Sequence, residues 1–505
     1  MEGGKLVAEL AQRLTGKAVI SSEIKDEDIK EIGVESLTAQ ALSYFEKSSG
    51  LNILDRATLS KILEREKESK SPVQIEVIQK RDFNPTAKDI ASDFSIRNAP
   101  LEKTPARVED FAVYFNNRFE KIKAAIERGR GGGLGIINSM ENLKQYANGR
   151  DVGVIGMVYD KIITKKGHIL VTLEDGTGQA KVLFIRPEKT SRKEMHELFE
   201  FASRLVSDEV VAIRGRVSSP FLMASAVIWP DIPIRQMKKA EEDFSIAFTS
   251  DIHVGSKLFM EKQFVKFIEW LNGNVDARRD IAEKIKYLVI AGDLVDGIGV
   301  YPNQDRELSV SDIYKQYAVF FDYLGNVPDH IEIFVLAGNH DALHRAEPQP
   351  PLGDELMQDF KRDNIHVASN PSYITLHGIK TLAYHGTSLN SVIQSIPSLS
   401  NSRPEAAMVE LLKKRHLSPI YGDNPIMPSK EDSLVMDVVP DILHMGHMHR
   451  NGYTEYHGTQ VINSGTWQSK TSYQTKQGHI PTPCILPIYN AKSGELWSMD
   501  FNAVS

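Results

Sequence analysis

The stretch Ile331-Glu-Ile-Phe-Val-Leu-Ala-Gly-Asn-His-Asp341 decides how the C-terminal half of this chain folds. A mostly apolar run, residues 331–336, leads directly into the polar cluster Gly338-Asn-His-Asp341. A short apolar run that ends in turn residues is typical of a buried strand. Ligand sites in α/β sheets lie just beyond the carboxyl ends of such strands. The stretch therefore predicts a strand that delivers polar side chains to a site at a sheet edge.

Four other segments repeat this arrangement. They are Ser245–Thr249 before Asp251-Ile-His253, Tyr287–Ala291 before Gly292-Asp293, Thr381–Tyr384 before His385-Gly386, and Ile442–Met445 before Gly446-His-Met-His449. Residues 243–505 alternate such strands with helices, which is the α/β pattern of a packed sheet with helices on its faces. Because each cluster follows a strand end, all five can meet in space.

The residue types of the five clusters point to one chemistry. Asp and His together suit Mn, Fe or Zn. A carboxylate that bridges two cations holds them about 3.5–4 Å apart, as two-metal phosphoryl transfer requires. Asp293 stands alone at its strand end and is the natural bridge, and the glycines before Asp293, Asn339 and His447 allow sharp turns. Any one cluster is a weak or moderate signal, but the ordered set predicts a two-metal site.

Length and composition set the limits of the interpretation. The 505 residues predict about three domains. The net charge of -7 gives no global signature of a nucleic-acid partner, so such a surface must be local. A single cysteine, Cys484, excludes an internal disulfide and a multi-thiolate zinc site. With no signal-peptide pattern and no 18-residue apolar run, we expect a cytoplasmic protein without a membrane span.

The N-terminal third carries no catalytic pattern. Residues 1–68 predict a small helical domain, with apolar residues at helical spacing that include Leu10, Leu14, Leu37, Ala41, Tyr44 and Phe45. We interpret it as a docking bundle. Residues 69–140 predict a polar linker up to about Pro105 and a connecting helix from Val108 to Arg128. The glycine-rich run Gly129–Gly135 could be a phosphate cradle or a flexible loop, and we favour the loop because no strand precedes it.

Residues 141–240 predict an oligonucleotide-binding (OB) β-barrel. The strand-like runs are Val152–Val158, His168–Leu173, Gln179–Ile185, Glu209–Val217 and Leu222–Trp229, with a helix at Glu194–Leu205. Five strands with a helix after the third is the OB order. The barrel could bind single strands or serve as a structural or protein-binding module. We favour the second role because only Phe184 and Trp229 are aromatic in these strands.

The ordered motifs resemble the calcineurin-like metallophosphoesterases over residues 243–470. Asp296 followed by Gly297, and Asp341 in the third motif, are unlike the protein phosphatases and closer to the DNA repair nucleases. A barrel before such a domain, with every metal residue present, resembles the small subunits of archaeal family D DNA polymerases. Val171–Gly178 and Ile462–Trp467 reinforce that resemblance. It implies a multidomain α+β fold with an N-terminal helical domain, an OB barrel and a C-terminal α/β phosphoesterase sandwich.

The resemblance also implies roles for individual residues. Asp251, His253, Asp293 and His449 would hold one divalent metal, and Asp293, Asn339, His385 and His447 the other. Manganese is favoured, with Mg, Fe or Zn as alternatives. His340 would donate a proton to the leaving oxygen. Asp341 would orient His340 or the third-motif loop, and Arg450 could contact a phosphate.

The implied function is a 3'-to-5' exonuclease that proofreads within a heterodimeric replicative polymerase. Its partners would be a large catalytic subunit and DNA with single-stranded or mismatched 3' ends, with a sliding clamp as a further candidate, at the nucleoid in the cytoplasm. A catalytically silent scaffold and a free-standing repair nuclease are the alternatives. Outside the motifs, we interpret His344, His366, His377 and His444 as packing or surface residues, and the sequence leaves open whether His457 and Trp467 line the site.

Overall fold

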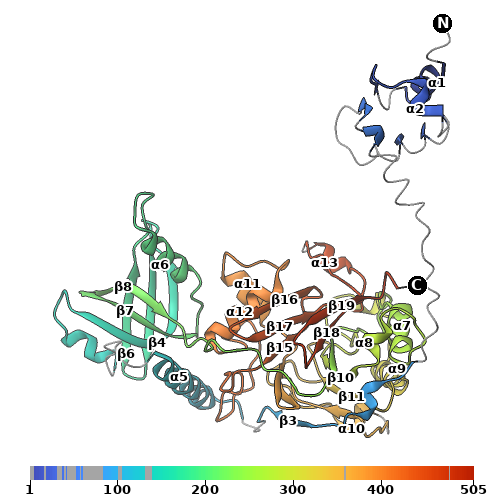
Figure 1. Cartoon of the computed structure of the whole chain (residues 1–505). Helices are drawn as coiled ribbons and strands as arrows, with labels where there is room; N and C mark the ends of the chain where they lie inside the picture. The colour runs from blue at the N-terminus through green and yellow to red at the C-terminus, as the bar shows by residue number, and fades with distance from the viewer. Residues whose placement is uncertain are drawn as a thin grey trace. The chain divides into compact units, whose positions relative to one another are not determined.

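The computed structural model (Figure 1) describes residues 5–15, 19–30, 34, 37–38, 41–42, 53–56, 58–60, 83–100, 105–130, 139–357, 360–476 and 478–504. The chain divides into two compact units, Met1–Asp82 and Phe83–Ser505. In these ranges, no helix is long and apolar enough to cross a membrane.

The N-terminal unit combines helices with a very short pair of strands. Its elements are α1 (Lys5–Arg13), α2 (Asp26–Lys30), β1 (Val19–Ile20) and β2 (Ile53–Leu54), and the two strands pair in parallel. The helically spaced Leu10, Leu14, Leu37 and Ala41 are fully buried in its core, as the sequence pattern predicts. The predictions for Tyr44 and Phe45, and for Gly131–Gly135 farther along the chain, lie outside the described residues.

The second unit contains a closed five-stranded barrel in the order β4-β5-β6-β8-β7. Its elements are β4 (Asp151–Ile163), β5 (Ile169–Asp175), β6 (Gly178–Phe184), α6 (Lys193–Ser203), β7 (Val210–Ser218) and β8 (Phe221–Ile228). The helix follows the third strand, so the predicted barrel order is confirmed. The barrel forms because alternate residues of each strand, such as Ile169, Val171 and Leu173 of β5, point into a shared core.

The two aromatic residues of the predicted barrel strands are both used in packing. Phe184 is 1% exposed. Trp229 donates from Nε1 to Glu209 Oε2 at 3.1 Å, and its ring meets Phe201 edge-on. Neither of these two rings is a free platform for a base. The observed β4 also contains Tyr159, which is 60% exposed, so the choice between the two roles of the barrel stays a prediction.

Two six-stranded sheets make up most of the remaining chain, where the sequence pattern had indicated one packed sheet. Their orders are β12-β11-β10-β9-β18-β19 and β16-β17-β15-β14-β13-β3. The strands are β9 (Ser245–Thr249), β10 (Ile285–Ala291), β11 (Glu332–Leu336), β12 (Ile365–Val367), β13 (Ser372–Leu376), β14 (Ile379–Ala383), β15 (Ile442–Met445), β16 (Asn451–Tyr456), β17 (Thr459–Ser464), β18 (Ile485–Asn490) and β19 (Leu496–Asp500). The motif strands β9, β10 and β11 are parallel neighbours in one sheet, and β14 and β15 in the other.

The sheets pack face to face, with helices on their outer faces. Phe248, Val289 and Leu336 of the first sheet meet Ile374 and Ile442 of the second in one apolar core. The helices are α7 (Glu261–Leu271), α8 (Arg279–Ala282), α9 (Ile313–Gly325) and α10 (Asp354–Met357) in the core of the first sheet, and α11 (Leu389–Ser395) and α12 (Pro404–Lys414) in that of the second. A short α13 (Ser472–Lys476) precedes β18. This layering brings the carboxyl ends of the motif strands from both sheets together.

Part of the predicted linker is a strand. β3 (Phe94–Asn98), which follows a 3-10 turn at Thr86–Asp89, pairs antiparallel with β13 at the edge of the second sheet. Phe94 and Ile96 pack on the core between the sheets. The prediction of a loose polar connection is therefore wrong for this segment, because long-range pairing supplies hydrogen bonds that local sequence does not reveal. The other domain boundaries remain predictions.

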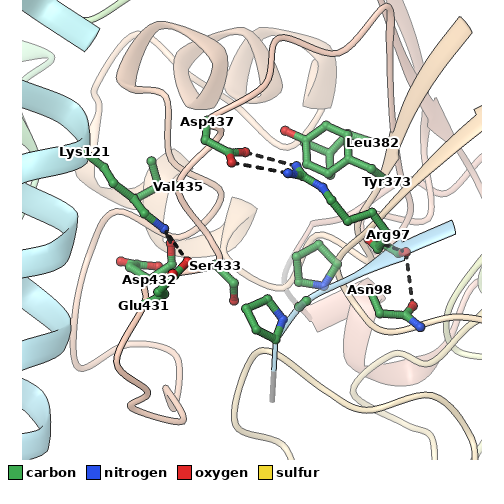
Figure 2. A pocket seen from close by; sticks show the side chains of 14 residues that line it. Arg97, Asn98, Lys121, Tyr373, Leu382, Glu431, Asp432, Ser433, Val435 and Asp437 are labelled. Atoms are coloured by element: carbon green, nitrogen blue, oxygen red, sulfur yellow. Dashed lines mark hydrogen bonds and ion pairs between the residues drawn. The ribbon is translucent and has the colours of Figure 1, made fainter. Parts of the chain in front are cut away.

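The connecting helix α5 (Val108–Arg130) fastens the barrel to the second sheet. Its Arg118 is completely buried and donates from Nε to Asp432 Oδ2 at 2.7 Å, and from Nη1 to the carbonyls of Asp208 and Pro419. A cavity of about 250 Å³ adjoins this contact. Lys121 of α5 pairs there with Glu431, beside the pair of Arg97 and Asp437 (Figure 2). Charged contacts thus hold the barrel and the sandwich in one unit.

Candidate metal centre

All seven predicted metal ligands come together at the ends of five strands. Five of them line a cavity of about 270 Å³ together with His340: His253, Asp293, Asn339, His447 and His449. Asp251 and His385 are fully buried and contact these residues. Side chains from both sheets therefore share one site.

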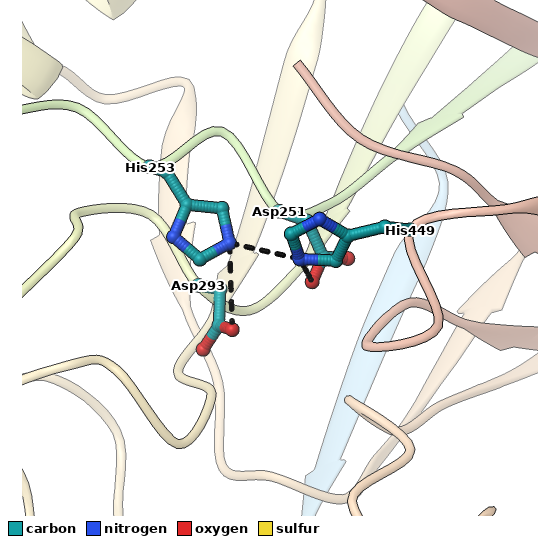
Figure 3. Close-up of side chains that lie close together, drawn as sticks. All are labelled: Asp251, His253, Asp293 and His449. Atoms are coloured by element: carbon teal, nitrogen blue, oxygen red, sulfur yellow. Dashed lines mark hydrogen bonds and ion pairs between the residues drawn. The ribbon is translucent and has the colours of Figure 1, made fainter. Parts of the chain in front are cut away.

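The first cluster contains two imidazoles and two carboxylates (Figure 3). His253 Nε2 lies 3.1 Å from His449 Nε2 and 3.8 Å from Asp293 Oδ2. His449 Nε2 lies 3.3 Å from Asp251 Oδ1. One ligand atom from each of the four residues lies within 4.8 Å of the others, which is close enough for one cation to contact all four.

The second cluster shares Asp293 with the first. His385 Nε2 lies 3.3 Å from Asp293 Oδ2 and 2.9 Å from Asn339 Oδ1. One ligand atom each of Asp293, His385 and His447 also lies within 4.8 Å of the others. Asp293 therefore stands between the two clusters, which is the position the sequence pattern indicated for a bridging carboxylate.

The atoms that face one another in these clusters suit a cation. Asp251 Oδ1 is buried and accepts no hydrogen bond from the described residues. The His253 and His449 Nε2 atoms face each other at 3.1 Å, and two nitrogens that bind one cation at about 2.0–2.1 Å each lie about 3 Å apart. A cation between them would satisfy these groups, so these buried Asp and His residues could hold divalent metal.

The charge balance of the site also favours cations. Burial opposes ionisation of Asp251 and Asp293, but neighbouring imidazoles keep the pKa of both carboxyls below the ordinary value. Burial lowers the pKa of His253, and that of His447 to about 3, so these rings are in the neutral form that binds metal. Burial also opposes charge on His385, yet Asp293 and Asp251 raise its pKa to about 10, so this position stabilises positive charge.

Strained backbone is concentrated on the predicted ligands. Asp251, His253, Asp293, His447 and His449 all have positive φ, between 51° and 66°. This left-handed conformation costs a non-glycine residue about 1–3 kcal/mol, and it persists only where the surroundings enforce it. Such outliers gather at functional sites, so their presence at five of the seven positions supports a site that the fold holds in a fixed geometry.

The motif glycines serve two different purposes. Gly292 has a φ of +86° and provides the predicted sharp turn before Asp293. Gly338 and Gly446 do not have positive φ, so these two positions need no left-handed backbone, although the chain bends directly after each of them. A Cβ atom on Gly338 would lie 2.3 Å from Asp293 Oδ1, and one on Gly446 would lie 2.3 Å from Asp251 Oδ2. These two glycines are needed because ligand carboxylates pack directly against the backbone.

His340 and its neighbour Asp341 have separate surroundings. The His340 backbone N–H donates to Asp293 Oδ1 at 2.9 Å, and its ring Nδ1–H donates to the Asp296 carbonyl at 2.8 Å. Its Nε2 has no hydrogen-bond partner among the residues that the structure describes. Asp341 is buried and accepts from the Gly338 N–H at 2.7 Å and from the Tyr317 hydroxyl at 3.0 Å. Asp341 therefore fixes the third-motif loop, which is one of the two roles its position suggested.

Three supporting residues have no role in the sequence prediction. Asp296 Oδ1 lies 3.1 Å from His253 Nδ1, Asn390 Nδ2 lies 2.8 Å from His447 Nε2, and Gln474 Nε2 lies 2.8 Å from His449 Nδ1. A carboxylate that accepts the Nδ1–H, as Asp296 does from His253, orients a metal-binding imidazole. The two amide nitrogens, by contrast, donate to the ring nitrogens of His447 and His449. Asp296 could have been found from its place three residues after Asp293, whereas Asn390 and Gln474 lie in helices that carry no metal motif.

Known proteins resemble the chain across this site and beyond it. The family of the alpha/epsilon B-subunits of DNA polymerases matches residues 246–453. The DNA polymerase II small subunit of Methanothermobacter thermautotrophicus is 39% identical over 81% of this chain and 82% of its own length. The chain belongs to the DNA polymerase II small subunit family. The same subunit of Pyrococcus furiosus is 35% identical over 97% of this chain and 83% of its own length, so the resemblance to the small subunits of archaeal DNA polymerases is confirmed.

Among solved structures, one described as a novel archaeal phosphodiesterase matches this small subunit with a TM-score of 0.26 and 16% identity. The match covers 51% of this chain and 99% of that protein.

The four histidines outside the motifs, His344, His366, His377 and His444, do not line the metal cavity as the described residues define it. His444 is buried, with Nε2 3.0 Å from Ser464 Oγ. His366 pairs with Glu332, His377 stacks near Phe244, and His344 contacts the Ala346 carbonyl. The packing or surface interpretation fits all four.

Three further residues of this small subunit lie off the cavity lining given by the described residues. Arg450 donates to the carbonyls of Ser402 and Ile480, which favours a structural role over a phosphate contact. His457 Nδ1 lies 2.9 Å from the Ile232 carbonyl. Trp467 is buried in the core of the first sheet and donates to Thr249 Oγ1 at 2.6 Å.

Proposed function

We propose that this small subunit carries a two-metal phosphodiesterase centre of the calcineurin-like superfamily and works as a 3'-to-5' exonuclease on DNA. The observation that carries the proposal is the shared position of Asp293, whose Oδ2 lies 3.3 Å from His385 Nε2 in one cluster and 3.8 Å from His253 Nε2 in the other. A carboxylate between two such clusters is the arrangement that two-metal phosphoryl transfer uses.

The ligand sets of the proposal follow the two clusters. Asp251, His253, Asp293 and His449 hold one cation, and Asp293, Asn339, His385 and His447 the other. The proposal takes Mn as the metal, as the resemblance implies, with Mg, Fe or Zn as alternatives, because mixed carboxylate and imidazole ligands accept several divalent ions. When bound, such cations stabilise negative charge on a phosphodiester and lower the pKa of water.

His340 is the general acid in this proposal. Its Nδ1–H is held by the Asp296 carbonyl at 2.8 Å, so the ring presents Nε2 to the cavity that it lines. The protonated ring transfers the Nε2 proton to the 3'-oxygen that leaves when the phosphodiester is cut. General acids of this kind contribute about 10²–10⁴-fold to rate.

The partners in the proposal follow from the family. The relatives are named as small subunits, so we propose a heterodimer with a large catalytic polymerase subunit, in which the exonuclease proofreads single-stranded or mismatched 3' ends. The polymerase reaction belongs to that complex. A sliding clamp is a further candidate partner, and the nucleoid in the cytoplasm is the proposed location.

The test compares Asp293→Ala with Asp322→Ala, a matched control on the exposed face of α9. We expect Asp293→Ala to lose bound Mn²⁺ and release of nucleotides from 3' ends while retaining its circular dichroism spectrum, because Asp293 lies at a sheet edge. Near wild-type nuclease activity in Asp293→Ala would refute the assignment. A wild-type chain that binds no metal would indicate a scaffold, and full activity as a stable monomer without a large partner would indicate a repair nuclease.

A further inference from the structure

The wall of the metal cavity carries three apolar side chains, Val300, Tyr301 and Met448, whereas every other described lining residue is polar or ionisable. Met448 is only 4% exposed and packs in the core of the second sheet, so Val300 and Tyr301 offer the accessible apolar surface. The Tyr301 ring centroid lies 6.2 Å from that of His340, the proposed general acid. A negatively charged phosphate gains nothing from the face of an aromatic ring, which is itself negative, so these side chains suit another part of the substrate.

The hydroxyl of Tyr301 is already engaged. It donates to Glu307 Oε2 at 2.9 Å. Burial and the neighbouring carboxylates of Asp296 and Glu307 raise the pKa of Tyr301 above its ordinary value, so the hydroxyl does not ionise near neutral pH. The group that Tyr301 offers to the cavity is therefore its ring.

The loop that carries Tyr301 is tied to the metal-binding loops. The Val300 N–H donates to Gln304 Oε1 at 2.8 Å, and Gln304 Nε2 donates to the Asp296 carbonyl at 2.7 Å. A Cβ atom on Gly297 would lie 2.2 Å from the His340 carbonyl oxygen, so the start of this loop packs directly on the third motif. The ring is thus held in place before substrate arrives, which lowers the entropic cost of a contact.

We propose that the ring of Tyr301, with its chain neighbour Val300, forms a nucleobase subsite that stacks on the base of the terminal nucleotide. The inference rests on the proposed function, because a nucleotide whose phosphate lies at the Asp and His ligands places its base one sugar away, beside this wall. Stacking on an aromatic ring accepts every base, since all have a π face. The subsite therefore selects nucleotide ends over other phosphodiesters without selecting sequence.

The first experiment measures binding and needs no cleavage. Isothermal titration calorimetry of the full chain, in the presence of Mn²⁺, measures the affinities for dAMP and for 2-deoxyribose 5-phosphate, which lacks the base. We expect wild type to bind dAMP about 5- to 150-fold more tightly than the baseless ligand, Tyr301→Ala to lose that preference, and Tyr301→Phe to keep it. Tyr314→Ala, at a half-exposed tyrosine of α9 outside the described cavity lining, is the matched control and should keep the preference.

Equal affinity of wild type for the two ligands, or no binding of either, would overturn the subsite, as would a preference that survives in Tyr301→Ala. If Tyr301→Ala loses affinity for both ligands equally, the ring has only a structural role, and this result would also overturn the subsite. A second measurement compares the cleavage rates of oligonucleotides that end in a normal or an abasic 3' residue. The rate for the normal end divided by the rate for the abasic end should be lower in Tyr301→Ala than in wild type. Failure of wild type to cleave either oligonucleotide contradicts the proposed exonuclease, while the binding comparison still decides the subsite.

Discussion

His253 Nδ1 lies 3.1 Å from Asp296 Oδ1, and both side chains are almost completely buried. The contact fixes the proton on Nδ1 and directs Nε2 toward His449 and Asp293. Gln304 and Gln468 in turn donate to the Asp296 carboxylate. The imidazole is thus oriented by a carboxylate that is itself held by two amides, which is how proteins position a metal-binding histidine.

The first prediction follows from this contact. Asp296→Asn keeps the size of the side chain but removes the charge that supports His253. We expect its Mn²⁺ affinity, measured by calorimetric titration, to fall about 10–100-fold. Asp305→Asn, an exposed carboxylate nearby in the chain, is the control and should bind as wild type does. Unchanged affinity in Asp296→Asn would mean that His253 needs no such support.

The second prediction concerns Gly338. An added Cβ would lie 2.3 Å from Asp293 Oδ1 and 2.8 Å from His385 Cε1, so Gly338→Ala must displace two proposed ligands. We expect loss of most Mn²⁺ binding, measured by elemental analysis after dialysis, with the secondary structure retained. Gly176→Ala, where no atom lies within 4 Å of the added Cβ, should retain its metal. Full metal content in Gly338→Ala would show that the Asp293 carboxylate can shift without loss of metal binding, which would contradict the prediction.

The motif strands could be predicted because their apolar runs identify themselves. Ser245–Thr249 is β9 residue for residue, and Ile442–Met445 is β15. Placing polar clusters at their carboxyl ends then brought the seven proposed ligands together without knowledge of the sheet order. The division into two sheets was not predictable in this way, because strand pairing depends on partners that are far apart in the sequence.

Residues that local patterns could not reveal are those with long-range partners. β3 alternates Phe94 and Ile96 with Ser95 and Arg97 in a polar segment, and it is a strand because β13, more than 270 residues later, pairs with it. Asn390 contacts His447 only because α11 lies beside the fifth motif loop. In both cases, tertiary contact rather than local propensity determines the outcome.

The third prediction concerns acid stability at the junction with α5. His416 Nε2 lies 2.9 Å from Asp432 Oδ2, and Asp432 also pairs with Arg118. Burial and the Arg118 charge lower the pKa of His416 to about 4, whereas an unfolded histidine titrates near about 6.5. Unfolding therefore takes up a proton between these values, and the free energy of unfolding falls as pH falls through this window.

From that difference in pKa we expect His416 to lower the free energy of unfolding by on the order of 3 kcal/mol between about pH 7 and pH 4. The lowered pKa of Asp432 reduces the free energy of unfolding further at more acidic pH. Urea unfolding at a series of pH values measures the slope. His416→Gln should have a shallower dependence than wild type, and His344→Gln, at an exposed histidine, should match wild type. Parallel slopes for His416→Gln and wild type would exclude this role.

The fourth prediction separates proton transfer from metal binding at His340. The His340 ring donates from Nδ1 to the Asp296 carbonyl. It also lies edge-on to the His253 ring, with 4.7 Å between the two centroids. Its backbone N–H, which holds Asp293 Oδ1, survives substitution of the side chain. We therefore expect His340→Ala to retain both metals and its affinity for DNA but to cleave about 10²–10⁴-fold more slowly in single turnover. Asp293→Ala, by contrast, should lose bound metal.

Metal content, measured beside the single-turnover rate, distinguishes a proton donor from a metal ligand at His340, because His253, Asp296 and His340 could also hold a cation together. Loss of metal along with activity in His340→Ala would make His340 a ligand rather than the acid.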